Sequence, residues 1–84
     1  MSEPIESLRK SVDNFSMAMG AKLIVNNEKM HWRNCTLEHL LSEFDKNVRA
    51  LKRAVETNQS HTVILGKAAN VANFAMMIAE RNNK

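Results

Sequence analysis

Residues 62–81 are apolar on almost every side of the helix that they would form. Between Thr62 and Glu80 the polar side chains are those of Lys67, Asn70 and Asn73. A helix that is hydrophobic nearly all round is buried on more than one side. Because a chain of 84 residues forms only a thin core, two further helices cannot enclose this one. We therefore expect a homo-oligomer, a dimer, tetramer or higher assembly, with this helix near its centre.

A first helix is indicated by apolar residues that recur at spacings of three and four. It should begin near Pro4, since proline suits the first turn of a helix, and run to about Lys29. Its stripe consists of Ile5, Leu8, Val12, Phe15 and Met19. Gly20 weakens the helix locally, which indicates that another backbone approaches closely there.

A second helix should begin after Thr36, whose hydroxyl suits the N-cap, and end near Thr57. Its stripe consists of Leu37, Leu41, Phe44, Val48, Leu51 and Val55. The polar residues 58–61 make a turn short enough to leave the second and third helices as antiparallel neighbours. The sequence thus predicts an all-α fold of three helices in a single domain, residues 1–84.

Charge and cysteine content exclude several classes of protein. The net charge is +3, and no run of like charges indicates a partner that is polymeric nucleic acid. Cys35 is the single cysteine, so an internal disulfide is excluded. The start of the chain lacks a signal-peptide pattern, and the strongly apolar residues 71–79 are too few to span a membrane. We expect a cytoplasmic protein without membrane contact.

Several polar residues occupy positions where the helical pattern favours apolar ones. On the first helix they are Lys22 and Asn26, on the second Lys46 and Asn47, and on the third Lys67, Asn70 and Asn73. If the helices pack together, these side chains could line one cleft of cations and amides, suited to an anionic ligand. In the alternative interpretation, Lys67 reaches solvent while Asn70 and Asn73 pair and set the register of an oligomer.

The segment between the first two helices contains His31, Trp32 and Arg33. An aromatic or imidazole ring there could stack on a nucleobase, with Arg33 or Lys29 near a phosphate. In the alternative interpretation Trp32 covers the hydrophobic core. His31, His39 and His61 lack the spacing of metal ligands, so no metal site is expected.

Two strings, KLIVNNEKMHWRNC (residues 22–35) and AANVANFAMMIAE (residues 68–80), resemble the small MazG-like all-α nucleoside triphosphate pyrophosphohydrolases of bacteria and phages. This resemblance implies a helical subunit completed by dimerisation or tetramerisation. It also implies magnesium-dependent release of pyrophosphate from a nucleoside triphosphate. In that family, a Glu-Glu-x-x-Glu motif on one helix and a Glu-x-x-Asp motif on the next hold the metal.

This chain departs from the family at the metal ligands. Alignment puts Lys46, Asn47 and Ala50 at the three glutamates of the first motif. Lys67 and Asn70 stand at the acids of the second. An ammonium group cannot ligate Mg²⁺ and repels it, so the sequence predicts no catalytic residue, no metal and no cofactor. Lysines there could instead hold phosphates directly.

The resemblance and its departures together predict an inactive MazG-like protein that binds a nucleotide or cyclic nucleotide. In a phage it could act in the host cytoplasm as a sponge for a nucleotide messenger of host immunity, and so evade anti-phage defence. Lys46 and Lys67 would contact phosphate, and Asn47, Asn70 and Asn73 a base or ribose. His31 and Trp32 would stack, and Lys22, Asn26, Lys29 and Arg33 would rim the pocket. The alternatives are a module that binds a host protein or an active MazG-like subunit, and a weakly active pyrophosphohydrolase.

Overall fold

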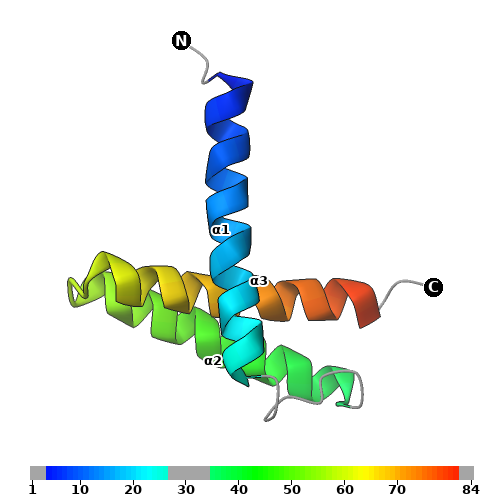
Figure 1. Cartoon of the computed structure of the whole chain (residues 1–84). Helices are drawn as coiled ribbons and strands as arrows, with labels where there is room; N and C mark the ends of the chain where they lie inside the picture. The colour runs from blue at the N-terminus through cyan, green and yellow to red at the C-terminus, as the bar shows by residue number, and fades with distance from the viewer. Residues whose placement is uncertain (1–3, 27–34, 82–84) are drawn as a thin grey trace.

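Three α-helices make up the computed structural model, which describes residues 4–26 and 35–81 (Figure 1). They are α1 (Ile5–Asn26), α2 (Leu37–Glu56) and α3 (His61–Arg81). No strand occurs in these two ranges. The predicted all-α fold is confirmed, and the helix bounds agree with the periodicity to within a few residues wherever the structure describes them.

The start of α2 follows from its capping residue. Thr36 has an extended backbone, and its side-chain oxygen accepts a hydrogen bond from the backbone N–H of His39 at 3.1 Å. This bond satisfies one of the N–H groups that have no partner within a helix at its first turn. The predicted N-cap is therefore confirmed.

A tight turn joins α2 to α3 and makes them antiparallel neighbours (Figure 1). Asn58 adopts a left-handed backbone with φ 55°. Its N–H donates to the Val55 carbonyl at 3.1 Å, and the Gln59 N–H donates to the Ala54 carbonyl at 2.9 Å. This pair of bonds is a Schellman motif, which ends α2 and reverses the chain. Ser60 then caps α3, since its side chain accepts from the Val63 N–H at 3.3 Å.

The helix α1 crosses α3 at a steep angle, and its first half stands clear of the other two helices (Figure 1). At the crossing, the Asn73 side-chain amide donates to the Met19 carbonyl at 3.0 Å. Further along, the end of the Lys22 side chain lies over Gly66 of α3. The second half of α1 is therefore attached to α3, whereas its first half has no packing partner within the described residues.

The core is small and lies where the three helices meet. Its buried cluster is Leu40, Phe74 and Met77, against which further side chains pack. These partly buried residues are Leu23, Cys35, Phe44 and Ile78. The helix α3 contacts both α1 and α2 and is therefore central within the subunit. Ala75 and Ala79 of α3 remain exposed, so one chain does not enclose this apolar helix.

The apolar stripes expected from the spacing are buried only in part. Phe15 and Met19 of the first stripe and Phe44, Val48 and Leu51 of the second are half-buried, and Phe44 packs against the core. On α1, Ile5, Leu8 and Val12 are 72%, 52% and 66% exposed. On α2, Leu40 and Ala54 are buried at 0% and 4%, whereas Leu41 and Val55 of the stripe are 46% and 54% exposed. The reason is geometric, because among the described helices α2 packs chiefly against α3 and turns the row of Leu40 and Ala54 toward it.

The close backbone approach predicted at Gly20 is not found within one chain. Apart from its chain neighbours and the backbone of its own helix, no described atom lies within 4 Å of the position where a Cβ on Gly20 would stand. At Gly66 an added Cβ would stand 2.9 Å from Cε of Lys22.

By length and composition alone α3 could cross a membrane, a property shared by core helices of soluble proteins.

Candidate anion-binding site

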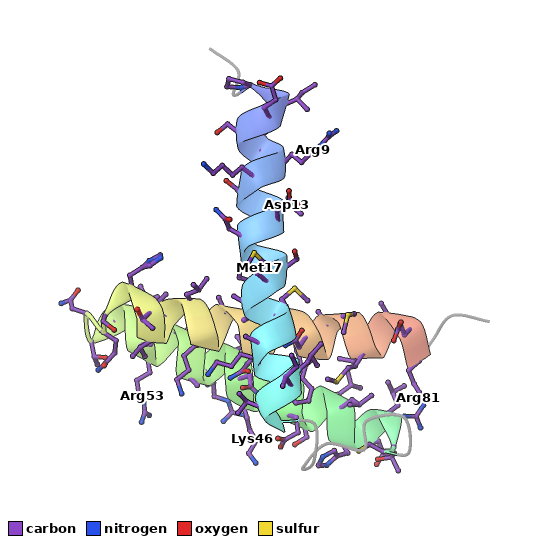
Figure 2. All side chains as sticks on the ribbon, viewed as in Figure 1. Arg9, Asp13, Met17, Lys46, Arg53 and Arg81 are labelled. Atoms are coloured by element: carbon purple, nitrogen blue, oxygen red, sulfur yellow. The ribbon has the colours of Figure 1, made fainter. Side chains whose placement is uncertain are left out.

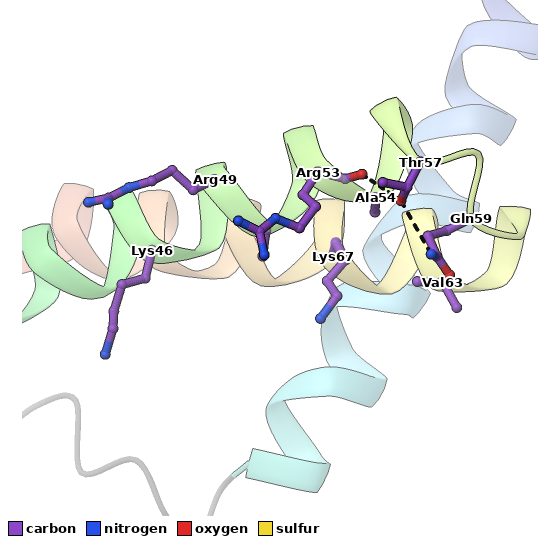
Figure 3. A pocket seen from close by; sticks show the side chains of 9 residues that line it. Lys46, Arg49, Arg53, Ala54, Thr57, Gln59, Val63 and Lys67 are labelled. Atoms are coloured by element: carbon purple, nitrogen blue, oxygen red, sulfur yellow. Dashed lines mark hydrogen bonds between the residues drawn. The ribbon is translucent and has the colours of Figure 1, made fainter.

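A groove of about 680 Å³ lies between α2 and α3 (Figure 3). Of the described residues that line it, four are cationic and none is acidic. The lining consists of Lys46, Arg49, Ala50, Arg53, Ala54, Thr57, Gln59, Val63 and Lys67. The groove therefore combines an apolar floor of small side chains with a basic rim.

Helical spacing explains why these cations share one side of the helix pair. Lys46, Arg49 and Arg53 follow one another at intervals of three and four, which places them on one face of α2. Ala50 and Ala54 lie on the same face, and their short side chains leave the hollow between the helices. Figure 3 shows Lys46, Arg53 and Lys67 extending from the same side of the helix pair.

The turn between α2 and α3 forms a polar end to the groove. The Thr57 hydroxyl donates to the Arg53 carbonyl at 2.7 Å, and the Gln59 side-chain N–H donates to the Thr57 hydroxyl oxygen at 3.2 Å (Figure 3). These bonds hold the Gln59 amide beside the hollow. The same Schellman turn that reverses the chain thus positions a hydrogen-bonding group at the groove.

The cations are accessible to a ligand. Arg49 and Arg53 are exposed, and Lys67 is half-buried. Lys46 pairs with Glu43 at 3.1 Å, but its side chain is 69% exposed. An exposed ion pair of this kind contributes little to stability, so Lys46 can turn to a ligand at small cost. Guanidinium groups bind phosphate through two parallel hydrogen bonds, which suits Arg49 and Arg53 to a phosphorylated ligand.

The structure brings two of the predicted ligand-binding residues, Lys46 and Lys67, to this groove. It places three predicted amides elsewhere. The Asn47 side-chain amide donates to the Glu43 carbonyl of its own helix at 2.7 Å. Asn73 is 4% exposed and bonds to α1, and Asn70 is half-buried outside the groove lining.

The remaining predicted residues belong to α1 and the segment after it. Lys22 is half-buried and lies against Gly66, outside the groove lining. Asn26 is the last residue of α1. Four predicted positions, Lys29, His31, Trp32 and Arg33, lie outside the described residues.

Arg49 and Arg53 were absent from the predicted site, although their spacing carried a signal. Together with Lys46 they form a basic row on α2, and small alanines follow two of them at positions 50 and 54. A basic row on one face of an amphipathic helix is ordinarily a solvated surface. Only the position of α3, which brings Lys67 to the same side, turns that row into one wall of a groove.

The alignment predicted from the sequence put five positions at the acidic ligands of MazG-like enzymes, and three of these positions, Lys46, Ala50 and Lys67, line this groove. Within residues 4–26 and 35–81, no group of three or more His, Cys, Asp or Glu side chains is arranged to hold a metal ion. The chain matches no protein-family model, no curated protein and no solved structure. The MazG resemblance therefore rests on the sequence strings alone.

Proposed function

We propose that the groove between α2 and α3 binds a nucleotide-like anion and holds it without hydrolysis. One observation carries the proposal, namely the four cations, Lys46, Arg49, Arg53 and Lys67, around a hollow whose described lining contains no acid. The hollow of about 680 Å³ falls in the range of small-molecule pockets, which is roughly 300–1,000 Å³.

The lining suits the two parts of a nucleotide differently. The phosphates would lie at the basic rim, where Arg53 and Lys67 offer donors and positive charge from both helices. The nucleoside would lie over the apolar floor of Ala50 and Ala54 toward the turn. There the Gln59 amide could hydrogen-bond a base or ribose edge.

We propose that the ligand is held without hydrolysis because lysines replace metal-binding acids of the family that the sequence resembles. In the predicted alignment, Lys46 and Lys67 stand at positions where those enzymes carry metal-binding acids. The ammonium groups can neutralise phosphates, but they cannot activate water as a bound metal does. A protein that only binds lowers the free ligand concentration by mass action, which is how a phage sponge for a nucleotide messenger would act. We propose that it does so as a homo-oligomer.

Calorimetry against linear and cyclic nucleotides tests the binding proposal, together with mass spectrometry of small molecules released from the denatured protein. We expect measurable binding that Lys67→Glu weakens at least about tenfold, because one charge-assisted hydrogen bond is replaced by repulsion. Lys10→Glu is the matched control, since Lys10 is exposed on α1 and far from the groove.

Three results would overturn the proposal. The first is the absence of binding to every nucleotide tested, and the second is an equal loss of binding in Lys67→Glu and Lys10→Glu. The third is Mg²⁺-dependent release of pyrophosphate from a nucleoside triphosphate, which would establish an enzyme instead.

A further inference from the structure

Among the described residues, nothing packs against the first half of α1. Every residue from 4 to 14 is exposed, and Figure 2 shows this part of α1, with Arg9 and Asp13, standing away from α2 and α3. We call residues 5–14 the α1 arm. A helical segment this short is marginal in water by itself, because most helical stability in proteins comes from packing an apolar face. Burial of its apolar face against a second surface would therefore stabilise the arm.

The apolar residues of the arm follow a heptad pattern. Ile5, Leu8 and Val12 alternate at spacings of three and four, and Phe15 and Met19 continue the series toward the crossing with α3. Ile5 and Val12 correspond to a positions and Leu8 to a d position of a helical seam. Such a seam packs against a second helix that carries the same alternation.

The matching helix face in this fold is on α2. Leu37, Leu41 and Val55 are 36%, 46% and 54% exposed, and they belong to one row with the same alternating spacing. The row occupies the flank of α2 opposite Lys46 and Arg53 of the groove. We call it the α2 row, and its members are Leu37, Leu41, Phe44, Val48, Leu51 and Val55. Phe44, Val48 and Leu51 are half-buried, and Phe44 packs against the core, so the exposed part of the row is Leu37, Leu41 and Val55.

The geometry points to a second copy of this chain as the occupant: the α1 arm of one subunit packs along the α2 row of another. Within a subunit this contact cannot form, because α1 is continuous and is fixed to α3 through Met19 and to the core through Leu23. A two-fold axis would make the exchange reciprocal, so the α1 arm and the exposed residues of the α2 row would be covered by one closed contact.

Charge along the two edges supports this pairing. Arg9 flanks the apolar stripe of the arm, while Glu38 and Asp45 stand beside the first half of the α2 row, followed by Lys52. All four side chains are exposed in the subunit. Opposite charges at the edges of a helical seam select partner and orientation. The groove, on the other flank of α2, stays accessible in such an assembly.

Analytical ultracentrifugation of the full chain and two variants tests this contact, which rests on the homo-oligomer proposed above. We expect self-association that Val12→Glu weakens at least about tenfold, because it places a charge in the seam. Met17→Glu is the matched control. Met17 is 72% exposed and lies on the other side of α1, and Val12 is 66% exposed, so neither change disturbs the subunit core.

A monomeric wild-type chain would overturn the contact and the proposed oligomer together. An oligomer that resists Val12→Glu, or one that both variants weaken equally, would overturn the contact alone. Neither result bears on nucleotide binding by the groove, which calorimetry measures separately.

Cross-linking identifies the surface that the arm contacts. In a Cys35→Ser background, Leu8→Cys and Leu41→Cys chains are mixed and treated with a short bis-maleimide. Dimers that require both variants support the contact between the α1 arm and the α2 row. Dimers formed by Leu8→Cys chains alone would show arm-to-arm pairing and overturn the proposal, as would the absence of cross-links from an oligomeric sample.

Discussion

At the residue scale, Asn58 determines how the second and third helices meet. Its left-handed backbone with φ 55° is the conformation that the Schellman turn requires. Asparagine tolerates this conformation better than most residues with a Cβ, and glycine tolerates it best. The identity of one residue therefore governs the turn beside the groove.

Replacing Asn58 with alanine should lower the free energy of unfolding by about 1 kcal/mol, since a methyl side chain gains nothing in the left-handed region. Asn58→Gly should match or exceed the wild type. Urea denaturation of both variants, followed by circular dichroism, measures the difference. Equal stability of Asn58→Ala and Asn58→Gly would contradict the left-handed assignment.

Gly20 offers a second test at this scale. It lies inside α1, and nothing stands within 4 Å of the position that a Cβ would occupy. Gly20→Ala should therefore raise the free energy of unfolding by about 0.5–1 kcal/mol through helix propensity alone.

Gly66→Ala is the comparison for Gly20→Ala. A Cβ on residue 66 would displace the end of the Lys22 side chain, so this change should raise the free energy of unfolding by less. Thermal denaturation ranks the two variants. A destabilising Gly20→Ala would indicate that a second backbone approaches α1 at this position, as the sequence first suggested.

At the element scale, the crossing of α1 over α3 depends on Asn73. Its side-chain N–H donates to the Met19 backbone carbonyl at 3.0 Å. The oxygen of the same side-chain amide is buried without a hydrogen-bond partner among the described residues. A buried polar atom without a partner costs roughly 1–3 kcal/mol. The crossing therefore combines one specific hydrogen bond with an unsatisfied acceptor.

Asn73→Asp should destabilise the chain by at least about 2 kcal/mol, because it places a charge at a site that is only 4% exposed. Asn70→Asp is the matched control on the same helix, and its half-buried position should make the change much smaller. Chemical denaturation compares them. Similar losses in the two variants would contradict the structural role of Asn73.

The helices themselves were predictable because their signals are local. The spacing of three and four, the N-cap at Thr36 and the polar turn at residues 58–61 each depend on neighbours in the sequence. The buried face of α2 was not predictable. The choice of Leu40 and Ala54 over Leu41 and Val55 depends on where α3 lies, and the position of α3 depends on contacts between distant residues.

At the scale of the whole molecule, one side of the α2–α3 pair presents four cations and, among the described lining residues, no acid. Lys46 and Lys67 could be singled out from the sequence because they interrupt apolar helix faces or replace expected acids. Arg49 and Arg53 could not be singled out in this way. Their solvent-facing row lines a groove only because α3 lies beside α2. The groove is thus a property of the assembled pair.

Binding at a groove with four exposed or half-buried cations should weaken steeply with salt. The screening length falls from about 10 Å at 0.1 M to about 3 Å at 1 M ionic strength. Calorimetric titrations of the same nucleotide at increasing salt measure the slope. An affinity independent of salt would show that contacts other than these cations hold the ligand.

The tight turn after α2 also has a consequence for how the chain folds. It brings α2 and α3 together through contacts that are close in sequence, and proteins dominated by such contacts fold quickly. The crossing of α1 instead joins Met19 to Asn73, which are 54 residues apart. We therefore expect the α2–α3 hairpin to form first and α1 to dock later. In that order of events, the basic groove exists before the subunit is complete.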